Sequence, residues 1–572
     1  MAVEQSKDKC VEANNKAEAA LKKDRKNYSG TDSGVEPVAV KRGIARQGEQ
    51  SEAEAALMLK GKQVELGIVS LAPGGEGVSK DFPVPVFINK AAPGDRLLVE
   101  IYDNRRTFAK GKLLKVIEAS KDRIDPLCKL FKVCGGCQWM HLNYAAQLEW
   151  KRALIEQSLR HIGGPELGNL LSQVLLPAVP AANQFGYRNK VQLPVRNPNK
   201  SKRLLAGYFE VNSHNLVNIK HCPIQPSLLD DILAKIKELA EKYNIVAYDE
   251  KTGHGLLRHI QMRISNASQE TLVTLVVNCG HNNMPTSLKT VALELMEQFS
   301  QIKGVCANYN QIKGNRILGE QTVCLAGQDF IEETLRTQKQ DFPAILQEGL
   351  KFKLSPTSFF QVNTPQTITL LELVAQEIQK YLLERASAQD SKKASSINNS
   401  NAITLLDAYA GVGTIALWLA AFVSRIIAIE SNPQAIKDGQ VNGSLNKINN
   451  VVFQLAKVED YLSVLLKSKT AVEIIVLDPP RQGLDPQVIE SIIKLQPELI
   501  IYISCNPVTL ARDLRQILFP PEPDLSSDGQ IRLEKKNDCL KLDFGYKVEK
   551  IIPVDLFPQT YHIESITVLK RQ

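Results

Sequence analysis

The chain has 572 residues, more than one hydrophobic core usually holds, so we expect several domains. Lysine and arginine number 70 against 62 acidic residues, and this formal charge of +8 fits a nucleic-acid partner without requiring one. No apolar signal segment opens the sequence, and the longest uncharged apolar stretch, residues 408–424, falls short of the ~20 residues of a membrane span. We therefore expect a cytoplasmic protein rather than a secreted or membrane-embedded one.

The N-terminal 120 residues divide into a tail and a β-rich region. Residues 1–60 contain one Tyr and neither Phe nor Trp, which predicts a disordered tail. Residues 61–120 show short β-patterned runs separated by Pro-Gly turns, which predicts a small five-stranded, OB-like β-barrel. Basic residues gather on its later strands. This pattern is typical of an RNA-binding face and equally of an edge strand whose charges prevent pairing with another chain.

Residues 121–349 mix cysteine-rich loops with β-patterned and helical runs, which predicts an α+β domain. Three of its cysteines have the spacing C-x5-C-x2-C, and a fourth follows in KHCPIQ. Four thiolates suit either a 4Fe-4S cluster or tetrahedral zinc, and the spacing does not choose between them. The candidate metal ligands are Cys128, Cys134, Cys137 and Cys222.

Two segments of this central region combine ring-bearing and basic side chains. Residues 185–190 read FGYRNK, and residues 257–263 read LRHIQMR. Such runs suit base stacking and phosphate contact in RNA-binding proteins. A strand with a solvated basic face has the same pattern, so neither segment is included among the candidate site residues.

Residues 350–572 alternate strands and helices, which predicts a doubly wound parallel sheet with a flexible insertion over residues 386–401. The strand ending at Asp407 leads through the turn AYAGVGT into an apolar helix, and the next strands end at Glu430 and Asp478. Three acids at the carboxyl edge of the sheet match the S-adenosylmethionine site of class I methyltransferases, which this region resembles. An ordinary nucleotide-binding layer is the alternative.

A further strand, ELIIYIS, ends directly before Cys505. Uracil C5 is too electron-poor to accept a methyl cation unaided, whereas a thiolate that adds to C6 makes C5 nucleophilic. The C5 proton must then leave, which requires a general base. Glu564 in the segment FPQTYHIES is the best candidate for that base, and His562 is the second.

Five motifs, FFQVN, DAYAGVGT, DPPRQG, SCNP and PQTYHIES, together resemble the RNA 5-methyluridine (uracil-C5) methyltransferase family. The resemblance implies S-adenosyl-L-methionine as cofactor, Cys505 as nucleophile and Glu564 as base. RNA cytosine-C5 enzymes carry an additional cysteine after the DPP motif, where this chain has Arg481. By the same resemblance the residues that contact the cofactor are Gln361, Tyr409, Thr414, Glu430 and Asp478.

The predicted barrel and the four cysteines resemble the iron-sulfur-containing 23S ribosomal RNA branch of this family, which has an N-terminal TRAM domain. That resemblance favours a 4Fe-4S cluster over zinc, and 23S rRNA as the partner of a monomer without an obligate protein partner. A transfer RNA uracil-C5 methyltransferase is the alternative enzyme. A ribosome-assembly factor that only binds RNA is the non-enzyme alternative, although it would need neither Cys505 nor Glu564.

Overall fold

The computed structural model of the protein describes residues 60–198, 201–390, 403–520 and 545–572. The chain divides into two units, Met1–Ala55 and Ala56–Gln572, and every described residue belongs to the second. The predicted tail therefore lies outside the described residues, apart from Lys60. Within these ranges no helix is long and apolar enough to cross a lipid bilayer.

The N-terminal β region is a six-stranded sheet with the order β1-β5-β6-β4-β3-β2. The sequence predicted five strands, but the first run breaks at Ile68 and Val69, whose N–H groups bond to Asp95 and Val78. Strands β1 and β2 are consecutive yet stand at opposite ends of the order, so this bend closes the sheet around its apolar core. The strands are β1 (Gln63–Gly67), β2 (Ser70–Leu71), β3 (Gly77–Ser79), β4 (Val86–Ile88), β5 (Arg96–Asn104) and β6 (Ala109–Glu118).

The central region contains a seven-stranded sheet with the order β13-β12-β11-β10-β7-β8-β9. On β7, Val191, Leu193 and Val195 pack against helices α5 (Ser227–Lys242) and α6 (Thr286–Gln298), whereas the alternating Lys190 and Gln192 belong to the opposite, polar face. The strands are β7 (Lys190–Arg196), β8 (Leu205–Phe209), β9 (Leu216–Asn218), β10 (Leu257–Ile264), β11 (Thr271–Val277), β12 (Ile302–Tyr309) and β13 (Gln321–Gly327).

The C-terminal sheet has the order β18-β17-β16-β19-β20-β22-β21, in which the first five strands are parallel and the last two antiparallel. Both faces of the buried strands are apolar, as a doubly wound sheet requires. The strands are β16 (Thr404–Ala408), β17 (Arg425–Glu430), β18 (Val451–Leu455), β19 (Ile474–Leu477), β20 (Leu499–Ser504), β21 (Tyr546–Val554) and β22 (Glu564–Arg571).

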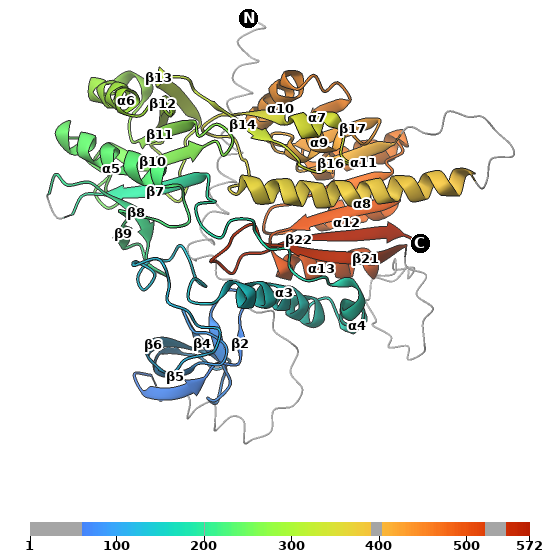
Figure 1. Ribbon diagram of the computed structural model, residues 1–572, viewed down its shortest axis with the longest axis horizontal. Helices are drawn as coiled ribbons and strands as arrows, with labels where there is room; N and C mark the ends of the chain where they lie inside the picture. The colour runs from blue at the N-terminus through green and yellow to red at the C-terminus, as the bar shows by residue number, and fades with distance from the viewer. Residues whose placement is uncertain (1–59, 199–200, 391–402, 521–544) are drawn as a thin grey trace, which may run out of the picture. The chain divides into compact units, whose positions relative to one another are not determined.

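Helices cover both faces of this sheet (Figure 1). One face packs against α8 (Thr364–Asp390), α9 (Thr414–Leu419) and α10 (Pro433–Leu445). The other face packs against five helices, two of which come from the region before the central sheet. These five are α3 (Tyr144–His161), α4 (Pro165–Val174), α11 (Val458–Ser468), α12 (Pro486–Leu495) and α13 (Pro507–Leu518).

The C-terminal core extends beyond the boundary that the sequence predicted at residue 350. Strand β14 (Ile331–Leu335) pairs with β15 (Leu350–Leu354) across that boundary, and α7 (Ala344–Glu348) lies between them. Helix α8 continues to Asp390, so the first five residues of the predicted insertion, 386–390, are helical. The rest of the insertion, residues 391–401, lies outside the described residues.

Candidate active site

The carboxyl edge of the C-terminal sheet contains the point where the strand order reverses. From β16 the chain proceeds to β17 and β18 on one side, and β19 and β20 lie on the other. Ligands of open α/β sheets bind in the crevice at such a switch point. The loops that follow β16, β17, β19 and β20 therefore form the candidate site.

The loop after β16 has three residues with positive φ: Tyr409 at 70°, Gly411 at 56° and Gly413 at 80°. Glycine tolerates this conformation, and at Gly413 a Cβ atom would also lie 2.8 Å from the ring of Phe453. Gly411 N–H donates to Glu430 Oε2 over 3.0 Å. The acid at the end of β17 thereby holds the loop that leads into Thr414, the first residue of α9.

Asp407, which is buried, and Asp478, which is partly buried, lie beside this loop. Burial raises the pKa of Asp478 to about 7. Burial and the neighbouring charge of Asp478 raise the pKa of Asp407, and the Ala416 backbone N–H only partly offsets this effect. Apart from this amide, neither carboxylate oxygen of Asp407 has a hydrogen-bond partner among the described residues. These acids suit a cationic ligand, whose charge would lower both pKa values.

Gln361 and Tyr409 are held by different parts of the fold. The Asn189 side chain donates to the Gln361 backbone carbonyl over 3.1 Å, and the Asn189 N–H donates to the Val362 carbonyl over 2.8 Å. The central sheet thus holds the loop that carries Gln361. Tyr409 is half-buried against the core beneath α11 and α12, and its burial raises the pKa of its hydroxyl.

Cys505 and Glu564 stand at neighbouring strand ends. Strand β22 is antiparallel to β20 and pairs Ser565 with Ser504, so the start of β22 lies beside the end of β20. Burial, followed by the charge of Glu564, raises the pKa of Cys505 to about 12, and Arg481 opposes this shift. Glu564 is 4% exposed, and burial followed by the charge of Asp478 raises its pKa well above the usual range.

The turn after Cys505 is bonded to the turn after Asp478. Asn506 caps helix α13 by accepting from Val508 N–H over 3.1 Å, and its side-chain amide donates to the Arg481 carbonyl over 2.9 Å. Cys505 thus precedes the N-terminus of a 12-residue helix, whose partial positive charge favours a thiolate. The Arg481 guanidinium acts on the thiol in the same direction.

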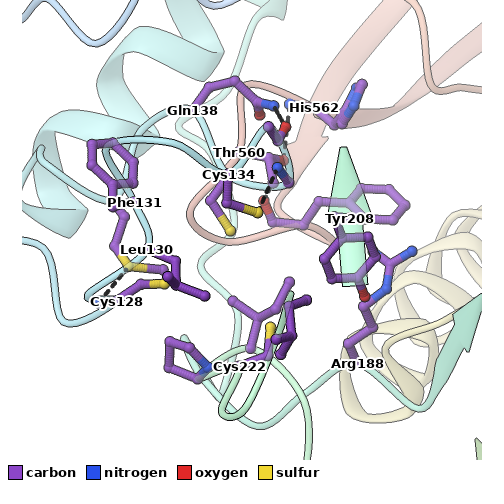
Figure 2. Close-up of a pocket in the computed structure, with 18 of the residues that line it drawn as sticks. Cys128, Leu130, Phe131, Cys134, Gln138, Arg188, Tyr208, Cys222, Thr560 and His562 are labelled. Carbon is purple, nitrogen blue, oxygen red and sulfur yellow. Dashed lines mark hydrogen bonds between the residues drawn. The ribbon is translucent and has the colours of Figure 1, made fainter. Parts of the chain in front are cut away.

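The four candidate metal ligands line one pocket of about 340 Å³. Cys128, Cys134 and Cys137 come from the loop before α3, and Cys222 comes from the loop before α5. Figure 2 shows sulfur atoms from both loops directed toward the pocket, with Arg188, Thr560 and His562 around it. The C-terminal segment that leads to Glu564 therefore borders the cysteine pocket.

The described residues include no group of three or more His, Cys, Asp or Glu side chains arranged to hold a metal ion. Burial raises the pKa of all three of Cys134, Cys137 and Cys222, and the neighbouring thiol charges raise these values further. The charges of Lys90 and Arg188 oppose these shifts at Cys134 and Cys137. The four cysteines thus share one pocket without being arranged as a metal site, and burial favours the neutral thiols of Cys134, Cys137 and Cys222.

Comparison with known proteins identifies the family. A sequence model described as tRNA (uracil-5-)-methyltransferase matches residues 144–519. The chain belongs to this family. An uncharacterized RNA methyltransferase of Gloeobacter violaceus is 34% identical over 520 residues, which cover 91% of this chain and 98% of that protein. Another, of Thermosynechococcus vestitus, is 35% identical over 510 residues, which cover 89% of this chain and 98% of that protein.

The fold is shared with a solved structure of Pyrococcus abyssi tRNA (uracil-54, C5)-methyltransferase in complex with S-adenosyl-L-homocysteine. The TM-score is 0.62 at 24% identity, and the match covers 88% of this chain and 99% of that one. Membership of the family makes this protein an enzyme that transfers the methyl group of S-adenosylmethionine to uracil C5 in RNA. The sequence prediction of that activity and cofactor is confirmed.

The segment of this methyltransferase that precedes Glu564 is held by α3, which sequence reasoning did not connect with the site. Lys151 Nζ donates to Asp555 Oδ1 over 2.6 Å and to the Phe557 carbonyl over 3.0 Å. Gln147 and Gln559 form two further hydrogen bonds. Neither side chain of the Lys151–Asp555 pair is exposed to solvent. Because Lys151 and Asp555 are far apart in the chain, local sequence gives no signal for this contact.

The pKa of His562, the second candidate for the base, shifts in the opposite direction to that of Glu564. Burial and the positive charges of Arg481, Lys151 and Arg188 lower its pKa to about 4. The imidazole is therefore neutral at physiological pH. Of the two candidates, Glu564 is the one whose charge acts on Cys505, and it starts the strand paired with β20. The sequence predicted Asp407 as a strand-end acid but assigned it no contact. It belongs with the candidate cofactor residues.

Proposed function

We propose that this enzyme forms 5-methyluridine in 23S ribosomal RNA, with Cys505 as the nucleophile and Glu564 as the general base. The observation that carries these roles is the pairing of β20 with β22, which supports a thiol and a carboxyl group acting together at the switch-point edge of the sheet. The four-cysteine pocket and the closed N-terminal sheet support the ribosomal substrate.

In this mechanism Cys505 adds to uracil C6, which makes C5 nucleophilic. S-adenosylmethionine supplies the electrophilic methyl group. Glu564 then takes the C5 proton, and elimination of the Cys505 thiolate restores the aromatic base and releases the product. With a pKa of about 12, the Cys505 thiol must release its proton to water as it attacks, which leaves Glu564 free for the later C5 proton, and Arg481 and the α13 N-terminus stabilise the resulting thiolate.

We infer that the cofactor lies against the loop 409–413. Glu430 would accept from the ribose hydroxyls, as strand-end acids do in such folds. Asp407 and Asp478 would face the cationic part of the cofactor, which accounts for two buried carboxylates without a counter-charge of their own. Gln361, Tyr409 and Thr414 would complete the proposed site.

We further propose that Cys128, Cys134, Cys137 and Cys222 hold a 4Fe-4S cluster. Four thiols from two loops that share one pocket fit such a group in number and chemistry. The cluster would cross-link the two loops beside the segment that leads to Glu564. Aerobically purified protein should be brown and contain iron and sulfide, and Cys137→Ser should lose both. A colourless protein with one zinc ion would contradict this assignment.

The substrate is tested with purified protein, labelled S-adenosylmethionine and unmodified transcripts of 23S rRNA and transfer RNA. We expect label in the 23S transcript and none with the Cys505→Ala variant. Label confined to transfer RNA would replace the proposed substrate by the one that the family description names. Label in neither RNA would contradict the proposed function.

A further inference from the structure

The polar face of the central sheet carries a cluster of cations next to the active site. Lys190 on β7 and Arg263 on β10 are direct partners in the antiparallel register. Arg188 precedes Lys190 by two residues, and its Nε donates to the Lys190 carbonyl over 3.1 Å. Like charges directly opposite each other on neighbouring strands destabilise a sheet. This arrangement therefore opposes folding unless a bound anion offsets it.

Arg188 and Lys190 are partly exposed, whereas Arg263 behind them is buried. Arg263 is 2% exposed. Burial, followed by the charges of Arg263 and Arg188, lowers the pKa of Lys190 to about 7. Desolvation destabilises the charged form of a cation that lacks a counter-charge and so lowers its pKa, and a nearby anion would raise that pKa again.

No protein carboxylate neutralises Lys190. Among the described residues its ammonium group takes part in no ion pair or hydrogen bond. Arg263 donates one Nη2 bond to the Ser358 carbonyl, and its Nε has no partner. The two acids whose charges act on Arg263 are Glu333 and Asp438. Both already accept several hydrogen bonds from serine, threonine, glutamine or backbone donors.

The position of the cluster connects it with catalysis. Arg188 lines the same pocket as Arg481 and His562 (Figure 2). Asn189, between Arg188 and Lys190, holds the backbone of the loop that carries Gln361. The cluster is thus connected through Arg188 with the pocket that Arg481 and His562 line, and through Asn189 with the loop that carries Gln361.

We propose that Arg188, Lys190 and Arg263 bind a backbone phosphate of the RNA beside the target uridine. An enzyme that works on an extruded base must hold the strand next to it, and Arg and Lys are the usual phosphate ligands. This inference rests on the proposed action on RNA. The other anion available to this enzyme is the carboxylate of S-adenosylmethionine, and the experiment separates the two.

The test compares Lys190→Gln and Lys190→Arg with the matched control Lys303→Gln, which removes a lysine on strand β12 of the same sheet that pairs with Glu270 over 3.4 Å. Binding of unmodified 23S and transfer RNA transcripts is measured from low to moderate salt. Loss of one phosphate contact should lower the slope of log K against log salt by about 1. We expect this loss in Lys190→Gln, its rescue in Lys190→Arg and no change in the control.

Two further readouts separate the possible causes. Lys190→Gln should melt at or above the wild-type temperature because it removes a like-charge contact, and the dissociation constant for S-adenosylhomocysteine should stay the same. A wild-type salt slope in Lys190→Gln would overturn the phosphate site, as would weaker S-adenosylhomocysteine binding with unchanged RNA binding. Because binding is measured without turnover, a failure of the proposed methylation would appear separately, as wild-type protein that binds RNA without labelling it.

Discussion

At the scale of single residues, Glu564 makes the Cys505 thiol harder to ionise in the free enzyme. The charge of Glu564 raises the pKa of the thiol, and burial raises the pKa of both groups. The free enzyme therefore holds a protonated, weakly reactive cysteine at neutral pH. Attack becomes favourable only when the site contains a uracil ring, whose C6 accepts electrons from the thiolate. Until then the protonated thiol reacts poorly with other electrophiles.

Glu564→Gln should make Cys505 more reactive toward iodoacetamide. At a pH where Glu564 is ionised, removing its negative charge lowers the thiol pKa, and each unit of decrease raises the thiolate fraction about tenfold at a pH below that pKa. The rate is measured between pH 7 and pH 10 by mass spectrometry of the Cys505 peptide. Exposed Cys324 serves as an internal reference whose rate should not change. A slower reaction at Cys505 would contradict the proposed coupling.

RNA that contains 5-fluorouridine should distinguish the roles of Cys505 and Glu564, because its C5 substituent cannot leave as a proton. Wild-type protein and Glu564→Gln should both form a covalent complex that survives denaturing electrophoresis, because attack and methyl transfer precede the step that needs the base. Cys505→Ala should form none, and Cys324→Ala should behave as wild type. An adduct that persists in Cys505→Ala would assign the nucleophile to another residue.

At the scale of elements, helix α3 supports the segment that leads to Glu564. Its N-terminal half contacts residues 555–559, and Ile155 and Leu159 in its other half belong to the same core as α13. Tyr144 adds a hydrogen bond of 2.8 Å to Asp555 Oδ2. The position of Glu564 thus depends on a helix that precedes it by about 400 residues in the chain.

Lys151→Met should destabilise the protein by about 3–5 kcal/mol, because it leaves the carboxylate of Asp555 buried without its partner. The free energy is measured by urea denaturation. Lys494→Met, which removes an exposed ion pair with Glu490, is the control and should cost under about 1 kcal/mol. Equal effects in the two variants would mean that the buried pair is not a special anchor.

The glycine loop after β16 allows a second prediction for an element. The added Cβ of Gly411→Ala would lie in open space, so this variant should lose only the roughly 1–2 kcal/mol of stability that a positive φ costs an alanine. Gly413→Ala has the same cost and also forces a Cβ against Phe453. We expect Gly413→Ala to weaken binding of S-adenosylhomocysteine more than Gly411→Ala does, by calorimetry. Equal affinities would show that the loop shifts without affecting the cofactor site.

At the scale of the whole molecule, the C-terminal sheet is completed by residues from earlier in the chain. Helices α3 and α4 and the hairpin strand β14 contribute to its two cores. A fragment of residues 350–572 should therefore unfold without a cooperative transition in circular dichroism, because both faces of the sheet lose apolar cover. The full chain is the control. A cooperative melt of the fragment, with binding of S-adenosylhomocysteine, would contradict this prediction.

The sequence by itself determined the class of enzyme, through five motifs that resemble one family, and predicted strands that end at Asp407, Glu430 and Asp478. Parallel strands with short turns present their terminal residues at one edge, so local pattern was enough to place these acids together. It also predicted the doubly wound sheet, and Cys505 and Glu564 as candidates for catalysis.

Only the tertiary structure decided which distant segments meet. The contact of Lys151 with Asp555, the register of Lys190 against Arg263 and the pocket shared by Cys222 and His562 all join residues far apart in the chain. Such contacts follow from strand register and helix packing, which depend on the whole core rather than on local periodicity. For the same reason α3, which sequence assigned to the central domain, packs on the catalytic sheet.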